Sequence, residues 1–144
     1  MRGKKKASRR SSCPINISLE ILGDRWSLLI VRDLMFRGFR TYKELVDSEE
    51  GIATNILADR LRRLEQCGII RIEEDTTDRR KQIYRLTAKG MDLAPVLVEL
   101  ILWGARYEDT EAPPALLRKM QKNRTEFLSE LRVRWAAAES HQVS

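Results

Sequence analysis

Apolar positions recur at helical spacing along most of the chain, and glycine or proline separates the segments. Pro14 opens the first helical pattern, which ends before Gly23. Asp24 suits the N-cap of a second helix, whose apolar stripe ends before Gly38. The first forty residues therefore predict two consecutive helices.

A short extended piece and a brief helix come next. The sequence FRT at 39–41 favours an extended backbone, and Thr41 with Glu44 three residues later forms a capping-box pattern. We predict a brief helix over residues 42–47, which a break at Gly51 follows.

The segment from Thr54 to Cys67 has the clearest amphipathic pattern. Leu57, Leu61 and Leu64 lie on one face at positions i, i+4 and i+7. The opposite face carries Asn55, Asp59, Arg62 and Gln66. Gly68 suits the residue just past a helix end, so a helix over Thr54–Cys67 is expected.

A strand pattern replaces the helical one after this helix. Ile70 and Ile72 alternate with charged residues, and Ile83, Tyr84 and Leu86 follow a polar stretch. That stretch, DTTDRRK at 75–81, has no Asn-Gly or Asp-Gly pair, so we expect a hairpin with a longer loop than a two-residue turn.

Two more helices are predicted at the carboxyl end. Thr87 suits the N-cap position of one long helix that reaches about Tyr107, and Pro95 is expected to kink this helix. A last helix is expected over about 115–138. The element order is a helix-turn-helix followed by a two-stranded hairpin. It predicts a mainly α winged helix-turn-helix fold in which 42–47 is the positioning helix and Thr54–Cys67 the recognition helix.

Composition excludes several classes of function. The chain of 144 residues suggests one domain, and no apolar run approaches a membrane span or a secretory signal, so a cytoplasmic location is expected. Two scattered cysteines and one histidine give no zinc site, and the chain lacks a phosphate loop and a nucleophile–base pair. We expect neither a metal, a cofactor nor enzyme activity.

The positive net charge of +6 comes from the amino-terminal arm. Six of the 27 Lys and Arg residues fall within residues 1–12, which hold no acidic residue, so the rest of the chain has 21 charges of each sign. Any anion-binding surface on the folded body must therefore arise from local clustering.

Several motifs together resemble a known family. They are the Cys13-Pro14 start, the Gly-x-x-Trp-x-x-x-Ile run at Gly23, Trp26 and Ile30, the segment GIATNILADRLRRLEQCGII at 51–70, and Leu-Thr-x-x-Gly at 86–90. Over about residues 13–107 the chain resembles the HxlR-type winged-helix transcriptional regulators of prokaryotes. The resemblance implies a homodimer that binds a palindromic operator in double-stranded DNA, and we expect a repressor rather than an activator.

The resemblance also divides the chain. Residues 1–12 are expected to be a disordered basic arm, 13–110 the DNA-binding domain and 111–144 a C-terminal helical extension. The chain departs from the family at Ala53, where a serine is common. Alanine cannot cap a helix, so we expect Thr54 to take that task and the helix to begin one residue later.

The outward face of the recognition helix is the candidate DNA surface. A helix fits the major groove, where asparagine can pair with adenine and arginine with guanine. Asp59 either accepts from cytosine or pairs with a nearby arginine. The alternative interpretation is a solvated face with ordinary ion pairs. The candidate contacts are Thr54, Asn55, Ala58, Asp59, Arg62 and Arg63.

Basic residues outside this helix are candidate phosphate contacts. Arg79, Arg80 and Lys81 lie at the hairpin tip, and Arg40 and Lys43 flank the positioning helix. Each group has a plainer explanation as a solvated polar surface, and Asp75 and Asp78 offset part of the charge at the tip.

Cys13 and the apolar helices suggest regulation and assembly. In some members of the family a cysteine at the matching place senses oxidants or electrophiles, and the basic arm and helix start beside Cys13 favour a thiolate. The alternative is a buried interface cysteine.

Surplus apolar residues predict dimerisation through the N-terminal helix and the long helix around 95–107. A small-molecule effector stays open, and the rival function is a protein-docking winged helix that does not bind specific DNA.

Overall fold

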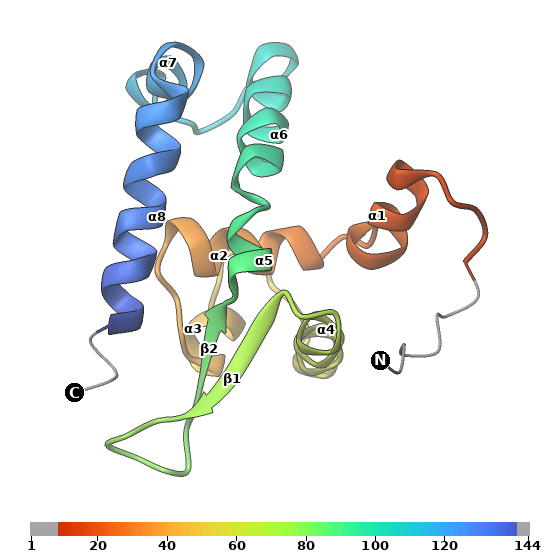
Figure 1. Ribbon diagram of the computed structural model, residues 1–144, viewed down its shortest axis with the longest axis vertical. Coiled ribbons are helices and arrows are strands. Elements are labelled where there is room, and N and C mark those ends of the chain that lie inside the picture. Colours follow the sequence, from red (N-terminus) through yellow and green to blue (C-terminus); the bar gives the residue numbers. More distant parts are fainter. Residues whose placement is uncertain (1–8, 141–144) are drawn as a thin grey trace, which may run out of the picture.

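The computed structural model describes residues 9–140, which form helices and one β-hairpin (Figure 1). Most of the predicted basic arm therefore lies outside the described residues. The mainly α fold with a small hairpin is confirmed. The elements are α1 (Pro14–Leu22), α2 (Ser27–Phe36), α3 (Tyr42–Val46), α4 (Thr54–Gln66), β1 (Ile70–Glu74), β2 (Gln82–Leu86), α5 (Ala88–Met91), α6 (Ala94–Tyr107), α7 (Pro114–Lys122) and α8 (Arg124–Ser140).

The predicted capping box begins α3. The Thr41 side chain accepts from the Glu44 backbone N–H at 3.2 Å, and the Glu44 carboxylate accepts from the Thr41 backbone N–H at 3.1 Å. At α4 the expected cap is wrong, because Ala53 occupies the N-cap without a side-chain hydrogen bond and Thr54 is the first helical residue. The start of α4 is held instead by a hydrogen bond from the Tyr42 hydroxyl to the Thr54 carbonyl oxygen.

The end of α4 depends on Gly68. This glycine has a φ of 75°, and its N–H bonds to Glu65 O at 2.9 Å while the next N–H, of Ile69, bonds to Leu64 O at 2.9 Å. Both bonds define a Schellman ending, which requires the left-handed conformation that glycine adopts without strain. The chain thus turns sharply from α4 into β1.

The two strands form an antiparallel hairpin with Ile70 opposite Leu86 and Ile72 opposite Tyr84. As predicted, a long loop over residues 75–81 joins them. The expected extended piece at 39–41 contributes one isolated antiparallel bridge, between Thr41 and Ile83, beside β2.

Both C-terminal helix predictions are wrong in continuity. The first of these helices ends at Met91 and a new one begins at Ala94. Pro95 lies in the first turn of α6 rather than at a kink, because a first-turn proline gives up no helical N–H bond. The last helix divides at Asn123, whose φ of −125° and ψ of 44° are not helical. The two halves, α7 and α8, then pack against each other as separate helices.

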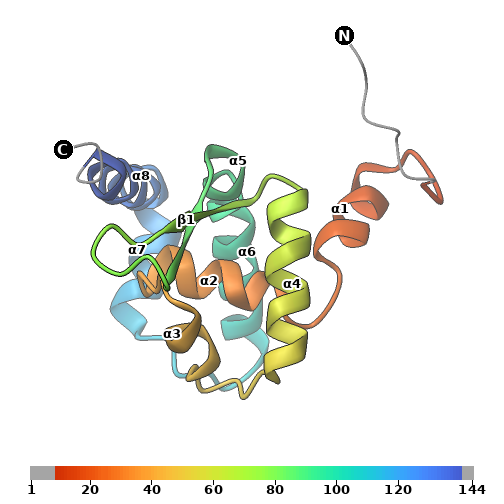
Figure 2. The same ribbon diagram turned by 90° about the horizontal axis from the view of Figure 1, so that it is seen from below.

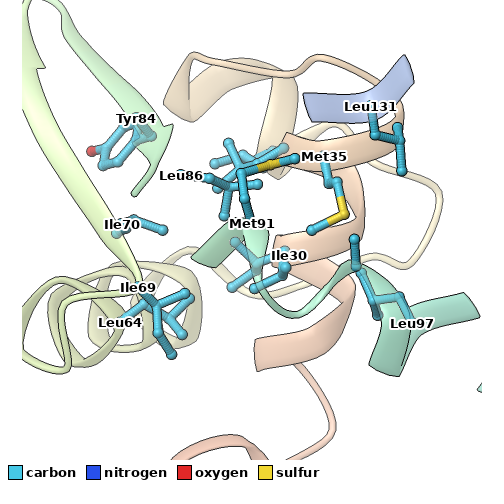
Figure 3. Packing of buried hydrophobic residues seen from close by; sticks show 14 of the residues in the cluster. Ile30, Met35, Leu64, Ile69, Ile70, Tyr84, Leu86, Met91, Leu97 and Leu131 are labelled. Carbon is cyan, nitrogen blue, oxygen red and sulfur yellow. The ribbon is translucent and has the colours of Figure 1, made fainter. Parts of the chain in front are cut away.

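One apolar core joins the helix-turn-helix to the hairpin and the C-terminal helices (Figure 3). Gly90 shows how tightly these parts meet, since an added Cβ there would lie 2.3 Å from the Ile69 carbonyl oxygen. Figure 3 labels the core residues Ile30, Met35, Leu64, Ile69, Ile70, Tyr84, Leu86, Met91, Leu97 and Leu131.

The molecule has distinct ends. α4 and the hairpin tip lie at one end and α6 and α7 at the other, while α1 stands beside the body (Figure 1). Seen from below, α4 lies lengthwise across the face, next to β1 and α3 (Figure 2). Within residues 9–140 no helix has the length and apolar character needed to cross a bilayer.

Candidate nucleic-acid interface

α4 is held by one face and exposed on the other. Leu57, Leu61 and Leu64 are 0%, 3% and 1% exposed, so the predicted stripe is buried in the core. The predicted contacts Thr54, Asn55, Ala58, Arg62 and Arg63 are all exposed. The structure therefore gathers these five side chains on the solvent side of one helix, α4, whose course Figure 2 shows.

Asp59 differs from the rest of this set. It is half-buried, and its carboxylate pairs with Arg60, while Arg62 lies 3.9 Å away one turn on. Of the two roles predicted for Asp59, pairing with a nearby arginine is the one seen, although its main partner is Arg60.

Arg60 is a residue that the sequence interpretation missed. Its Nε donates to Asp24 Oδ1 at 3.0 Å, which ties the middle of α4 to the turn before α2. Asp24 Oδ1 also accepts from the backbone N–H groups of Trp26 and Ser27 at 2.8 and 3.0 Å, and the Ser27 hydroxyl donates to Oδ2. Burial alone would raise the pKa of Asp24, but the hydrogen bonds from Ser27, Trp26 and Arg60 outweigh it and lower the pKa to about 2.

Asp24 was predicted as the N-cap of α2. The helix begins at Ser27 with Trp26 as its N-cap, and Asp24 accepts hydrogen bonds from the backbone N–H groups of both residues. The only sequence signal for Arg60 is its place three residues after Leu57, on the flank of the buried stripe.

The start of α4 is fixed from α3. The Tyr42 hydroxyl donates to the Thr54 carbonyl oxygen at 2.9 Å, across the turn of the helix-turn-helix. Spacing alone did not indicate this contact, since it depends on how the two helices cross. It places the first turn of α4 relative to the rest of the domain without a side-chain cap.

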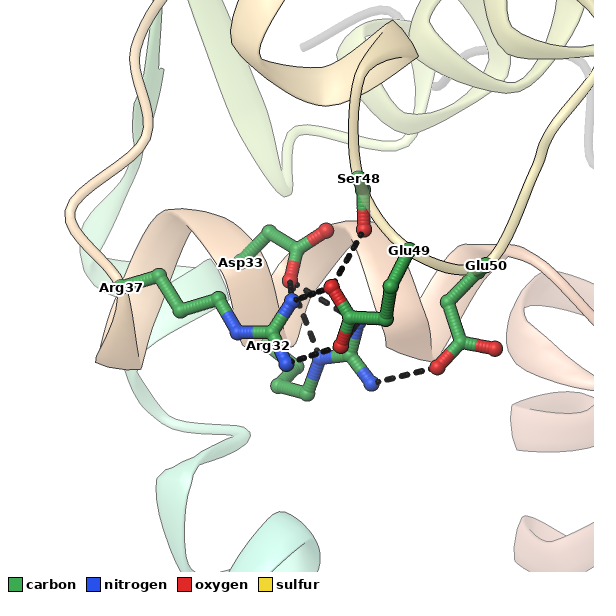
Figure 4. Close-up of polar contacts among 6 residues, drawn as sticks. All are labelled: Arg32, Asp33, Arg37, Ser48, Glu49 and Glu50. Atoms are coloured by element: carbon green, nitrogen blue, oxygen red, sulfur yellow. Dashed lines mark hydrogen bonds and ion pairs between the residues drawn. The ribbon is translucent and has the colours of Figure 1, made fainter.

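A cluster of ionic groups joins the end of α2 to the turn between α3 and α4 (Figure 4). The buried Asp33 carboxylate accepts from Arg32 Nε at 3.0 Å and lies 3.1 Å from Arg37 Nη1. Arg37 also donates to Glu49 with both terminal nitrogens, and these bonds lower the pKa of Glu49 to about 2. Arg32 Nη1 reaches Glu50 at 3.1 Å. Arg37 therefore organises the turn that precedes α4.

The hairpin tip presents exposed basic groups on an ordered loop. Arg79, Arg80 and Lys81 are all exposed. Asp78 accepts from the Arg80 backbone N–H at 3.1 Å and from Arg80 Nε at 3.2 Å, so the charge of Arg80 is partly offset. Asp75 accepts two bonds from Thr77, both at 2.9 Å, which lower its pKa and fix the turn.

The two basic residues predicted beside α3 have different surroundings. Lys43 is exposed and its Nζ lies 3.0 Å from Asp47. Arg40 is half-buried and lines a cavity against α8, and its backbone carbonyl accepts from the Tyr84 N–H at 2.8 Å. Lys43 therefore lies in solvent beside Asp47, whereas Arg40 contributes to the cavity wall.

Cys13 is exposed at the N-cap of α1, where its carbonyl accepts from Ile17 N at 2.9 Å. Cys67 is partly buried against the core at the end of α4. Within the described residues no group of three or more His, Cys, Asp or Glu side chains could hold a metal ion.

Two helices expose large apolar side chains. No residue of α1 is buried, and its Ile15 and Leu19 are 71% and 59% exposed. On α6, Trp103 and Tyr107 are 65% and 64% exposed, and their rings contact with centroids 5.8 Å apart. An apolar groove of about 500 Å³ runs between α2 and α6.

Comparison with known proteins gives the same family that the sequence motifs suggest. The model of the HxlR-like helix-turn-helix family matches residues 21–112. A regulator of Synechocystis, sll1512, is 35% identical over 100 residues, covering 69% of this chain and 73% of that protein. A regulator of Mycobacterium tuberculosis, Rv3095, is 38% identical over 102 residues, covering 70% of this chain and 63% of its own length. Both are named uncharacterized HTH-type transcriptional regulators.

Among solved structures, the reduced form of the transcriptional regulator YodB of Bacillus subtilis matches with a TM-score of 0.56 and 33% identity. The match covers 67% of this chain and 95% of YodB. YodB is also known in quinone-bound and diamide-treated forms.

Proposed function

The chain belongs to the HxlR-like helix-turn-helix family of DNA-binding transcriptional regulators, and from this premise we propose that it is a homodimeric repressor of a palindromic operator. The observation that carries the proposal is α4, which buries three leucines and exposes Thr54, Asn55, Ala58, Arg62 and Arg63 on one face. We propose that this face enters the major groove, with the protein acting in the cytoplasm by binding rather than by catalysis.

Asn55 and Arg62 are the proposed base-reading residues. They lie seven residues apart, two helical turns, and both are exposed on the outer face of α4. An asparagine can bond to adenine N6 and N7, and an arginine to guanine O6 and N7. Asp59 is engaged by Arg60, so its role is to orient the helix surface rather than to read a base.

The hairpin and α3 supply the proposed phosphate contacts. Arg79 and Lys81 are exposed at the tip, whereas Arg80 is offset by Asp78. Such contacts add affinity for any sequence and position the reading helix. Lys43 on α3 is a further proposed phosphate contact, since it is exposed, although Asp47 offsets part of its charge.

Dimerisation through α1 and α6 follows from their exposed apolar residues. Ile15 and Leu19 on α1, and Trp103 and Tyr107 on α6, would be removed from water by a second copy of the chain. A twofold dimer presents two copies of α4 to two half-sites, which matches a palindromic operator.

We also propose that Cys13 makes the regulator responsive to electrophiles. YodB, a relative, binds a quinone, and Cys13 is an exposed thiol at the start of the proposed dimer helix. Addition of its thiolate sulfur to a quinone ring carbon forms a thioether, and the ring takes up a proton and becomes the hydroquinone. The adduct would crowd α1 and weaken the dimer.

A DNA-binding titration tests the proposal. The protein is titrated against genomic and random duplexes at two salt concentrations, alongside Asn55→Ala, Arg62→Ala and a control, Arg118→Ala, at an exposed position on α7. A tight subset of duplexes with a steep salt slope is expected, and each α4 variant should lose about 1–3 kcal/mol on the preferred sites only. Uniform weak binding would instead favour the protein-docking function.

The cysteine proposal has its own control. Cys13→Ser should bind DNA normally and ignore benzoquinone, whereas Cys67→Ser should respond as the unmodified chain does. A Cys13→Ser protein that still releases DNA on quinone addition would rule out Cys13 as the sensor.

A further inference from the structure

A cavity of about 260 Å³ lies between the end of α2, strand β2 and helix α8. Its floor is part of the core, with Met35, Leu86, Met91 and Leu131 contributing (Figure 3). The family model ends at residue 112, so α8, which closes one side, lies outside the part that defines the family. The cavity is therefore formed jointly by the family domain and by α8 of the C-terminal extension.

The extension is firmly attached at this point. The Trp135 indole N–H donates to the Leu86 carbonyl oxygen at 2.9 Å. Glu139 pairs with Arg71 Nη2 at 2.5 Å, which links the last turns of α8 to β1. Both contacts hold α8 against the hairpin, so the helix forms one wall of the cavity.

The polar lining of the cavity is mostly arginine. Arg37, Arg40, Arg85 and Arg134 line it, with Glu139 as the acidic member. Glu139 is paired with Arg71, and Arg37 is paired with Glu49 and Asp33. Within residues 9–140 neither Arg40 nor Arg134 has an ion-pair partner, so the cavity carries a local excess of positive charge.

Arg85 is the decisive residue. Its side chain is only 5% exposed, and its Nε lies 3.2 Å from Glu73, a carboxylate that also serves Arg71. No acceptor on the described residues takes the N–H groups of its two terminal nitrogens. Neither terminal nitrogen is fully buried, so an incoming carboxylate could reach them and accept two parallel bonds.

The remaining walls suit a flat apolar group. Phe39 and Trp135 are half-buried and line the cavity, and the Met35 side chain lies in its floor. Methionine sulfur and aromatic faces both pack favourably against an aromatic ring. An engineered cavity of about 150 Å³ holds benzene, so 260 Å³ admits one ring with a short acidic substituent.

We propose that this cavity binds a small aromatic carboxylate, with the carboxylate on Arg85 and its neighbours Arg40 and Arg134 and the ring between Phe39 and Trp135. Because β2 runs from the hairpin loop directly to Leu86, an occupied cavity would stiffen the base of the hairpin. The inference does not depend on DNA binding and can be tested without it.

Calorimetry with benzoate and phenylacetate as probes provides the first test. Benzamide keeps the ring without the charge, and acetate keeps the charge without the ring, so each should bind at least about tenfold more weakly. Equal affinity for benzamide, or no heat of binding with either aromatic acid up to about 10 mM, would overturn the proposal.

Variants and a spectroscopic signal locate the site. Arg134→Met should weaken benzoate at least about tenfold, while the exposed Arg118→Met should leave it unchanged. Ala138→Phe keeps every arginine but fills the cavity, so it should abolish binding. In ¹⁵N correlation spectra benzoate should shift the indole signal of Trp135 and not that of exposed Trp103. Movement of Trp103 alone, or unchanged affinity in both site variants, would place any binding elsewhere and refute the inference.

Discussion

The Asp24 carboxylate offers a quantitative test of how α4 is held. It accepts hydrogen bonds from two backbone N–H groups, the Ser27 hydroxyl and the Arg60 guanidinium. Asp24→Asn keeps the shape of the side chain and removes its charge. Some backbone bonds survive in this variant, but the charge-assisted bond to Arg60 does not.

The magnitude follows from the pKa. The native contacts lower the pKa of Asp24 from its ordinary 3.8 to about 2, and its side chain is 19% exposed. By linkage, this fall corresponds to about 2 kcal/mol of folding stability at neutral pH. Since the pKa falls on folding, the contribution is complete above pH 3.8 and disappears as the pH drops through about 2.

Urea unfolding of both proteins across this pH range measures the effect. Asp24→Asn should unfold with about 2 kcal/mol less free energy at pH 7, and the gap should close towards pH 2. Asp109→Asn, at an exposed position after α6, is the matched control and should change little at any pH. A gap that stays constant down to the lowest pH, or no gap at pH 7, would refute the electrostatic account of Asp24.

Three further predictions concern the candidate interface and its support. Leu61→Ala, at a position 3% exposed, should cost about 2–5 kcal/mol in urea unfolding, and a cost below 1 kcal/mol would contradict the burial of this face. Tyr42→Phe removes the 2.9 Å hydrogen bond to Thr54 O and should lower the free energy of unfolding by about 1 kcal/mol. In this variant amide hydrogen exchange should become faster in the first turn of α4, and unchanged exchange there would show that the bond does not order the turn. Arg79→Glu should weaken binding to all duplexes alike and reduce the salt slope by at least about one, whereas an unchanged slope would remove the hairpin tip from the interface.

The sequence predicted the elements whose signals are local. The capping box at Thr41, the leucine stripe of α4 and the glycine that ends it depend on residues within one or two turns of each other. The alternation around Ile70 and Ile72 likewise predicted the hairpin and its long loop. The exposed candidates on α4 followed from the same stripe, since burying one face exposes the other.

Features that depend on tertiary contact were not predicted. From its neighbours alone Pro95 suggests a kink in one long helix, whereas the structure ends α5 at Met91 and begins α6 at Ala94. Arg60 looks like another solvated arginine, because its partner Asp24 lies 36 positions away in the chain. The break at Asn123 has no glycine or proline to mark it, although α7 and α8 both pack residues on the core on either side of it.

The exposed surface of α1 has a consequence for how the molecule is studied. α1 has nine residues and none is buried, and an isolated helix of that length is marginal in water. Ile21 and Leu22 pack partly against the core, and in the proposed dimer a second copy would add further stability to α1, which would link its helix content to protein concentration. Dilution should therefore lower the helix content measured by circular dichroism before the rest of the domain unfolds. The helix content of α1 would then report the fraction of the protein that is dimeric.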